Sequence, residues 1–172
     1  NADDGIEFFG GAANVKNLIL VDNNDESLDW DDGWRGNVQY TLIRQGVDVK
    51  GDHGIEADTL GKDTLPESDP VVANVTFQTV NNNFGADSDE SGSDDLFRFK
   101  KGTNGTLINV AADGYAECVK AEGTGVDVEL VNVVAECAAY EGGSYQTGDA
   151  ADGSIVYSDA NVDATNFGNN TV

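Results

Sequence analysis

Acidic residues recur in this chain within a repeated short stretch, first seen as Asp3-Asp4-Gly5-Ile6-Glu7-Phe8. In successive copies of that stretch the central acid is Glu7, Asp29 and Glu56. On neighbouring parallel strands these carboxylates would lie about 4.8 Å apart. One calcium ion, with ligand distances of about 2.4 Å, could bridge two of them. We therefore expect Glu7, Asp29 and Glu56 to be candidate calcium ligands.

Other acids near glycines and turns extend this candidate calcium site. The nearest to the first three are Asp25, Asp31 and Asp32, and further candidates are Asp3, Asp4, Asp22, Asp87, Asp89 and Glu90. None of them follows the EF-hand loop or the glycine-rich nonapeptide pattern of calcium-binding β-rolls. The alternative is a solvated acidic face that binds no ion. Arg98 supports this alternative, because it interrupts the acidic column and could pair with Glu56 or Glu117.

A glycan-cleaving site is a second chemistry to consider. A retaining glycosidase needs two carboxyl groups about 5–5.5 Å apart, but every stacked acid pair meets this distance, so it discriminates nothing. A calcium-dependent lyase would use a basic side chain beside the acids, and Arg35, Arg44 and Lys50 are the bases near them. Trp34 and Arg35 lie in a glycine-flanked turn and are candidate glycan contacts, whereas Trp30 is expected in the core.

The single histidine and the two cysteines limit the remaining chemistry. His53 would have to serve any Ser-His-Asp arrangement, and we expect it instead to lie in a turn. One histidine and two cysteines cannot supply a zinc or haem site. Cys118 and Cys137 are 19 residues apart, which would place them one coil apart at a distance that a disulfide bond can span. The alternative is two reduced, buried thiols.

The repeats indicate how these residues are positioned. After Asp3, the six-residue stretch starts again at Asp25, Asp52, Asp94, Asp113 and Asn132, at intervals of 22, 27, 42, 19 and 19 residues. Each repeat has room for two or three short strands and cannot bury an apolar face alone, which is typical of stacked repeats. We predict an all-β fold, a right-handed parallel β-helix (solenoid) of about six coils. A leucine-rich repeat and an antiparallel sandwich are weaker alternatives.

Alternation along each predicted strand assigns residues to columns. One inward column would hold Ile6, Leu28, Ile55, Phe97, Ala116 and Ala135, and the next would hold Phe8, Trp30, Ala57, Phe99, Cys118 and Cys137. The outward column between them would hold Glu7, Asp29, Glu56, Arg98, Glu117 and Glu136. In a second strand Val15, Val38, Val75 and Val128 align as inward, and the apolar runs that follow predict a bend or a second covering layer.

The whole chain, residues 1–172, is predicted to form a single domain. The 42-residue interval is too long for one coil, and two turn-rich segments, 58–70 and 81–93, are predicted to be loops. Residues 142–172 are predicted to form an irregular C-terminal coil or cap. The first coil begins without a cap, so we expect either upstream coils of a longer solenoid or another molecule to cover this edge.

Composition excludes several classes of partner. The chain carries 32 acidic and 9 basic residues, for a net charge of −23, which repels nucleic acid and anionic membrane surfaces. No apolar run reaches the roughly 20 residues of a membrane-spanning helix. Two cysteines and no methionine fit an oxidising compartment.

The opening residues also resemble a known family. The matching pieces are Asn1-Ala2-Asp3-Asp4-Gly5-Ile6-Glu7-Phe8-Phe9-Gly10-Gly11, Asn14-Val15-Lys16-Asn17, Ser27-Leu28-Asp29-Trp30, Gly33-Trp34, Gly36 and Gly54-Ile55-Glu56-Ala57-Asp58. Over residues 1 to about 80 the chain is similar to secreted or lipid-anchored bacterial proteins with a right-handed parallel β-helix and mostly no assigned activity. The resemblance implies this fold and a secreted or cell-surface location, and it carries over no catalytic residues.

These observations predict a non-enzymatic, structural or adhesive β-helix of the bacterial exterior. It requires no cofactor, with calcium as the candidate stabilising ion, and it could associate end to end through its open edge or bind a polysaccharide. The alternative is a calcium-dependent polysaccharide lyase or glycoside hydrolase, which rests on analogy of fold alone.

Overall fold

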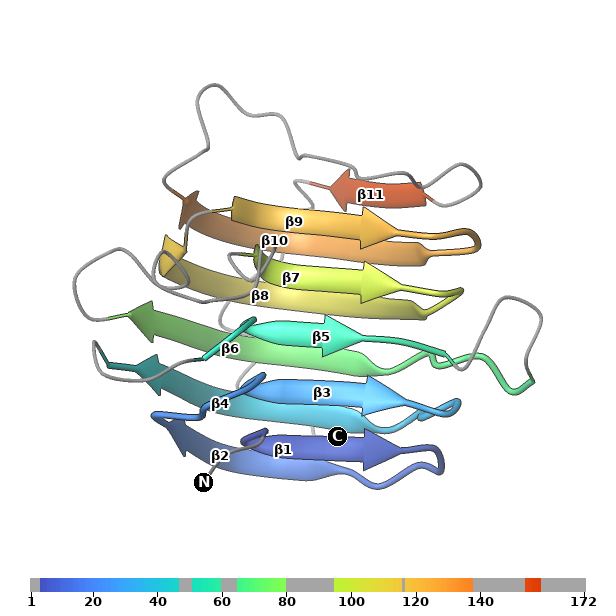
Figure 1. Ribbon diagram of the computed structural model, residues 1–172, viewed down its shortest axis with the longest axis horizontal. Coiled ribbons are helices and arrows are strands. Elements are labelled where there is room, and N and C mark those ends of the chain that lie inside the picture. Colours follow the sequence, from blue (N-terminus) through green and yellow to red (C-terminus); the bar gives the residue numbers. More distant parts are fainter. Residues whose placement is uncertain are drawn as a thin grey trace.

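The computed structural model describes residues 4–46, 51–59, 65–79, 95–115, 117–137 and 154–158, and every element in these ranges is a β-strand. The strands form two parallel sheets (Figure 1). Sheet A contains β1 (Ile6–Phe9), β3 (Leu28–Asp31), β5 (Ile55–Ala57), β7 (Asp95–Lys100) and β9 (Glu117–Glu122). Sheet B contains β2 (Val15–Val21), β4 (Asn37–Gln45), β6 (Val71–Thr79), β8 (Asn104–Tyr115), β10 (Asp127–Cys137) and β11 (Ser154–Ser158).

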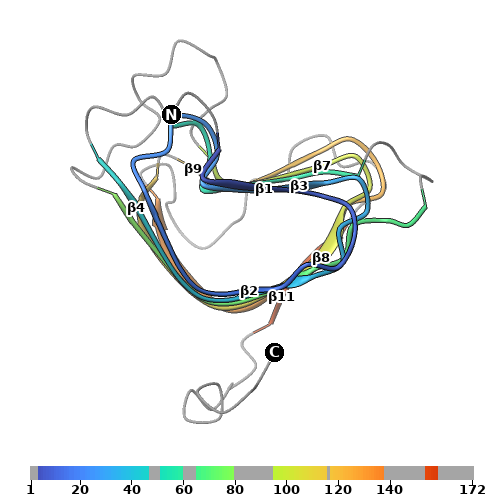
Figure 2. The ribbon, with the colours of Figure 1, turned by 90° about the horizontal axis from the view of Figure 1, so that it is seen from below.

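The chain alternates between the two sheets, so that each strand pairs in parallel with the strand two elements later. Seen along the stack, successive coils superpose and the two sheets enclose a common interior (Figure 2). The described residues make five coils, and β11 adds a sixth strand to sheet B. The predicted parallel β-helix is therefore confirmed.

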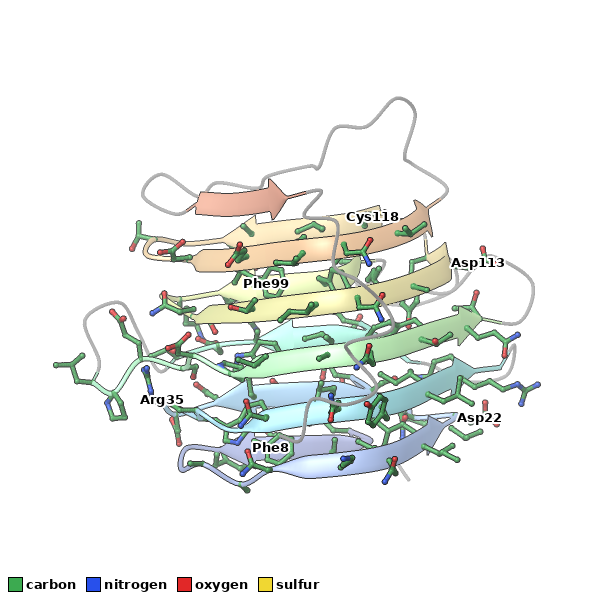
Figure 3. All side chains as sticks on the ribbon, turned by 180° about the vertical axis from the view of Figure 1, so that it is seen from behind. Phe8, Asp22, Arg35, Phe99, Asp113 and Cys118 are labelled. Carbon is green, nitrogen blue, oxygen red and sulfur yellow. The ribbon has the colours of Figure 1, made fainter. Side chains whose placement is uncertain are left out.

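The core fills the space between the sheets with stacked apolar side chains. The inward columns of sheet A contain Leu28, Ile55 and Phe97 in one row and Trp30 and Phe99 in the other, all fully buried. The rings of Phe97 and Phe99 stack with their centroids 6.0 Å apart. Figure 3 shows Phe8 and Phe99 in the interior, with Asp22 and Arg35 at opposite sides of the stack.

The predicted columns are correct through Phe97, Arg98 and Phe99 and wrong beyond them. Phe97 pairs with Val119, Arg98 with Lys120 and Phe99 with Ala121, instead of Ala116, Glu117 and Cys118. The predicted fifth stretch, at residues 113–118, contains the end of β8 and the start of β9. The predicted sixth stretch, residues 132–137, belongs to β10 in sheet B, so Ala135, Glu136 and Cys137 lie outside the sheet A columns. Small residues in an alternating pattern fit either sheet, and only strand pairing distinguishes them.

A bend divides sheet B, which is one of the two alternatives that the apolar runs predicted, the other being a second covering layer (Figure 2). It falls at one residue of each coil, and these residues form a corner column: Asn17, Tyr40, Asn74, Asn109 and Asn132. All five have left-handed backbone conformation, with φ between 53° and 60°. Asparagine adopts this conformation more readily than other residues with a side chain, which explains its recurrence here.

The corner also corrects the valine alignment. Val38 pairs with Val72, not with Val75, because Asn74 is equivalent to the corner residue Tyr40 and not to Asn37. Val72 in turn pairs with Leu107 rather than with Val128. The predicted inward column is thus occupied by apolar residues, but by different ones in the later coils.

Of the predicted loops, only part of 58–70 is described, and it packs against the turn that follows β3. Ser68 is buried: its backbone N–H donates to Thr59 Oγ1 over 2.8 Å, and its hydroxyl accepts from the Gly33 backbone N–H over 3.1 Å. The predicted loop 81–93 lies outside the described residues, as does the predicted cap 142–172 apart from β11.

Candidate functional site

Ionisable side chains gather on the outer face of sheet A and in the turns that lead into it. Two neighbouring groups can be distinguished there. The acidic cluster consists of Asp4, Glu7, Glu26 and Asp29, from the first two coils. The ion-pair cluster consists of His53, Glu56, Arg98, Lys100, Lys120 and Glu122, from the following coils.

The acidic cluster centres on Glu26, which is only 7% exposed. One carboxylate oxygen each from Asp4, Glu26 and Asp29 lies within 4.8 Å of the other two. Asp4 Oδ1 also accepts a hydrogen bond of 3.1 Å from the Glu26 backbone N–H. Glu26 takes part in two further close groups, one with Asp25 and Asp52 and one with His53 and Glu56.

This crowding changes the protonation of two carboxyl groups. Burial, reinforced by the charge of Glu56 and by the contact with Asp4, raises the pKa of Glu26 to about 10. Burial, with the charges of Glu56, Asp4 and Glu7, raises the pKa of Asp29 to about 8. Both groups therefore favour a bound proton or a bound cation over an isolated negative charge.

The ion-pair cluster centres on Arg98. Its Nη2 lies 3.0 Å from Glu122 Oε2, and its Nη1 lies 3.7 Å from Glu56 Oε2. Lys100 Nζ pairs with the other oxygen of Glu56, and Lys120 Nζ lies 2.9 Å from Glu122 Oε1. Burial tends to lower the pKa of Arg98, but its hydrogen bonds and ion pair with Glu122 outweigh this and raise it. Arg98 is therefore held in its protonated form.

His53 is fully buried beneath this cluster, although the sequence predicted that it decorates a turn. It does precede β5, but its Nε2 lies 2.9 Å from Arg98 Nη1. Burial, together with the charges of Arg98 and Lys100, lowers the pKa of His53 to about 4, so the ring is neutral at pH 7 and Nε2 accepts from the guanidinium. Arg98, which lies 45 residues later in the chain, contacts the His53 ring, so the burial of His53 depends on a partner that is distant in sequence.

The predicted calcium ligands separate into two groups in the structure. Asp29, Glu56 and Asp25 each belong to one of the close groups around Glu26, and the exposed Glu7 adds its charge to Asp29. Asp31 and Asp32 lie at the opposite end of β3, where Asp31 ends the strand and Asp32 has a φ of 55° in the turn. None of the close acidic groups found among the described residues includes either of them.

Glu26 was missed, although the sequence contained a signal for it. It occupies the second position of the repeated six-residue stretch, where the two neighbouring copies have Asp4 and His53. The strand register places these three residues two positions before Ile6, Leu28 and Ile55 and so brings them into one column.

The predicted glycan contact at Trp34 is contradicted by its burial. Trp34 is 0% exposed, and its ring stacks on Phe8 with a centroid separation of 4.1 Å and an interplanar angle of 2°. Its Nε1 donates to the Ala13 carbonyl over 3.1 Å. The flanking glycines allow close approach: a Cβ added at Gly36 would lie 1.9 Å from the same Ala13 oxygen.

The other bases near the predicted site are also placed by the structure. Arg35 is exposed, and its Nη2 lies 2.6 Å from Asp69 Oδ2. Arg44 is exposed on β4 of sheet B, and Lys50 lies outside the described residues. The bases beside the acids are instead Arg98 and Lys100, far along the sequence.

The cysteines do not share a column. Cys118 lies in β9 of sheet A and is 7% exposed, whereas Cys137 ends β10 of sheet B, and its side chain is outside the described residues. Cys118 is nevertheless disulfide-bonded, and Cys137 is the only other cysteine in the sequence, which agrees with the predicted pairing.

Comparisons with known proteins locate the chain in one family. A family model described as a pectate-lyase-like β-helix domain matches residues 1–168, which is nearly the whole chain. No curated protein and no solved structure matches. Within the described residues, no helix has the length and apolar character that crossing a membrane requires. The two parallel sheets agree with the family match, and the chain belongs to the pectate-lyase-like β-helix domain family.

Proposed function

We propose that the chain is a structural or adhesive β-helix of the cell exterior, stabilised by calcium at the acidic cluster and without glycan-cleaving activity. One observation carries the proposal. In the described part of sheet A and the turn after β7, each basic side chain pairs with a carboxylate: Arg98 and Lys120 with Glu122, Lys100 with Glu56, and Lys101 with Asp58. A general base must be able to take up a proton, and the carboxylate partners of Arg98, Lys101 and Lys120 raise the pKa of these three cations, which opposes loss of the proton that they carry.

The donor set of the acidic cluster fits calcium. Calcium binds carboxylate oxygens at about 2.3–2.6 Å, so two ligands on opposite sides of one ion lie about 4.8 Å apart. Oxygens of Asp4, Glu26 and Asp29 lie within that separation, and Asp29 Oδ1 is buried without a hydrogen-bond partner. The group of Glu26, His53 and Glu56 fits a cation less well, because the guanidinium of Arg98 adjoins it. An ion at the acidic cluster would offset the repulsion among these carboxylates, which adds to the effect of burial in raising the pKa values of Glu26 and Asp29.

The second candidate function is that of a calcium-dependent polysaccharide lyase or glycoside hydrolase. The family match favours it, and so does the arrangement of the acidic cluster and Arg98 on strands of the same sheet. For lyase chemistry Arg98 would have to lose a proton, which its raised pKa opposes. For hydrolase chemistry Asp29 or Glu26, with a raised pKa, would be the proton donor.

End-to-end association belongs to the same proposal. The strands β1 and β2 form one edge of both sheets, with backbone groups available for a further parallel strand. Three inward residues of this first coil, Ile6, Val15 and Leu18, are only partly buried. A second copy that stacks on this edge would complete their burial.

Thermal unfolding with calcium, with magnesium and with EDTA tests the ion. At a calcium concentration of 100 times the Kd we expect about 2.7 kcal/mol of added stability, which is a rise in Tm of roughly 5–10 °C. The variant Asp29→Asn should lose most of this rise, whereas Asp32→Asn, in the distant turn, should keep it. An equal response in both variants would contradict calcium binding at the acidic cluster.

Incubation with a panel of anionic and neutral polysaccharides tests catalysis. Release of reducing ends, or absorbance from unsaturated sugar products, would establish the second candidate. The control is that Arg98→Leu or Glu26→Gln must abolish product formation, because the activity of a contaminating enzyme would be unaffected by either change. We expect no product from any polysaccharide in the panel.

A further inference from the structure

The outer face of sheet B carries an apolar column that runs along the stack. It lies two residues after the corner column and consists of Ile19, Leu42, Thr76, Ala111 and Val134. Ile19 is 67% exposed and Val134 is 64% exposed, although both are large apolar residues. Four of the five residues are apolar, and exposed apolar side chains aligned along a stack are typical of a binding surface.

Two hollows lie between this apolar column and the corner column. One, of about 350 Å³, spans the first three coils, and the other, of about 260 Å³, spans the last three. Both are lined by Asn74, so they meet at the third coil and form one corner groove. From Asn17 to Asn132 the groove crosses four coil-to-coil steps of about 4.8 Å, for a length of about 19 Å.

The corner groove is uncharged in a protein with a net charge of −23. Its described lining consists of asparagine, threonine, tyrosine and aliphatic residues, with no aspartate, glutamate, lysine, arginine or histidine. An anionic ligand would gain no ion pair there and would be repelled by the overall charge. The lining therefore favours a neutral ligand with both apolar and hydrogen-bonding surfaces.

The asparagine side chains of the corner column are joined by hydrogen bonds, and this series is interrupted at one point. Asn132 Nδ2 donates to Asn109 Oδ1 over 3.1 Å, and Asn109 Nδ2 donates to Asn74 Oδ1 over 2.6 Å. The next residue in the column is Tyr40, which has no carboxamide, and Asn74 Nδ2 is left buried without a hydrogen-bond partner. The donor that lacks a partner thus belongs to the residue at which the two hollows meet.

We propose that the corner groove binds a neutral, β-linked polysaccharide chain that lies parallel to the stack. The pyranose rings of such an extended chain advance by about the coil spacing of 4.8 Å, so each ring can face one coil. A peptide strand advances by only about 3.3 Å per residue and would fall out of register. A second copy would present another concave groove, and two concave surfaces cannot fill each other. The apolar faces of the rings would contact Ile19, Leu42 and Val134, and their hydroxyls would face the amides.

This proposal rests on the adhesive role and assigns a surface and a ligand class to it. The test is native affinity electrophoresis of the full chain in EDTA, in gels that contain hydroxyethylcellulose, mixed-linkage β-glucan or galactomannan. Gels with polygalacturonate or alginate, with and without calcium, provide the anionic arm. We expect retardation by at least one neutral polymer in EDTA and none by the anionic polymers.

Three variants locate the binding. Ile19→Asn and Val134→Asn, at the two ends of the groove, should each weaken binding about tenfold, because each removes a buried apolar contact. The matched control is Phe9→Asn on sheet A, since Phe9 has the same exposure (66%) as Ile19 and Val134, and binding should be unchanged. Circular dichroism confirms that each variant is folded.

Four results would overturn the groove proposal. The first is no retardation by any neutral polymer, and the second is equal weakening by Phe9→Asn. The third is a change from dimer to monomer in Ile19→Asn, measured by light scattering, which would identify a second copy as the occupant. Binding of anionic polymers that requires calcium would refute the groove alone and leave a calcium-dependent adhesive role intact, whereas glycan cleavage would refute the proposed function.

Discussion

Replacing Tyr40 with asparagine should stabilise the protein relative to the alanine variant at the same position. Tyr40 is the only residue other than asparagine in the described corner column, and it has a φ of 59°. Both Tyr40→Asn and Tyr40→Ala remove the aromatic ring, including its contact with Lys16 Nζ 5.4 Å from the ring centroid. The comparison between these two variants therefore cancels the loss of the ring.

Two contributions make up the expected difference. Asparagine tolerates the left-handed conformation better than alanine, which is worth about 1 kcal/mol. Its carboxamide would also accept from Asn74 Nδ2, the buried donor without a partner, and one such hydrogen bond contributes about 1 kcal/mol. Tyr40→Asn should therefore be more stable than Tyr40→Ala by about 2 kcal/mol.

Urea unfolding measures this difference as a change in the transition midpoint at constant slope m. The two contributions can be separated with Asn74→Ala as a second background. Without the Asn74 donor, the advantage of asparagine over alanine at position 40 should fall to about 1 kcal/mol. Because both variants share that background, its own cost cancels.

The result that would refute this reasoning is equal stability of Tyr40→Asn and Tyr40→Ala. It would mean that the left-handed conformation at position 40 does not favour asparagine over alanine. It would also mean that a carboxamide at position 40 does not accept a hydrogen bond from Asn74. An advantage that is the same in the Asn74→Ala background would refute only the hydrogen-bond contribution.

Three further predictions follow from other parts of the stack. Burial raises the pKa of Asp29 to about 8 in the folded protein, so the native state binds more protons than the unfolded state between pH 4 and pH 8. In EDTA, Tm should therefore rise when the pH is lowered from 9 to 7, and Asp29→Asn should reduce this dependence. Because Cys118 is disulfide-bonded and Cys137 is the only other cysteine, Cys118→Ala and Cys137→Ala should each lose about 3 kcal/mol of stability, and the intact protein should gain two mass units on reduction; a free thiol titre of two per chain would contradict the bond. Gly36→Ala should destabilise the protein by about 2 kcal/mol or more, measured by urea unfolding, because its Cβ would lie 1.9 Å from a backbone oxygen.

The sequence alone was sufficient to predict the fold and the pairing of the first four strands of sheet A. The alternation in Ile6-Glu7-Phe8 and its copies at Leu28 and Ile55 predicted the observed register. This works because a strand has a period of two, and one buried face determines the register of its neighbours. Asp29, Glu56 and Asp25 were also identified as members of an acidic site, since carboxylates at equivalent repeat positions must stack.

The tertiary structure decided which of these acids meet and which bases offset them. Sequence separation gave no indication that Arg98 would contact His53. It also did not indicate that Glu26, rather than Glu7, would be the buried centre of the acidic cluster. Both depend on turn length, which sets how adjacent coils align. Burial of Trp34 depends on Phe8 and on the backbone of a neighbouring turn. Strand period is a local property of the backbone and can be read from the sequence, whereas lateral packing between coils depends on turns whose conformation only the folded stack determines.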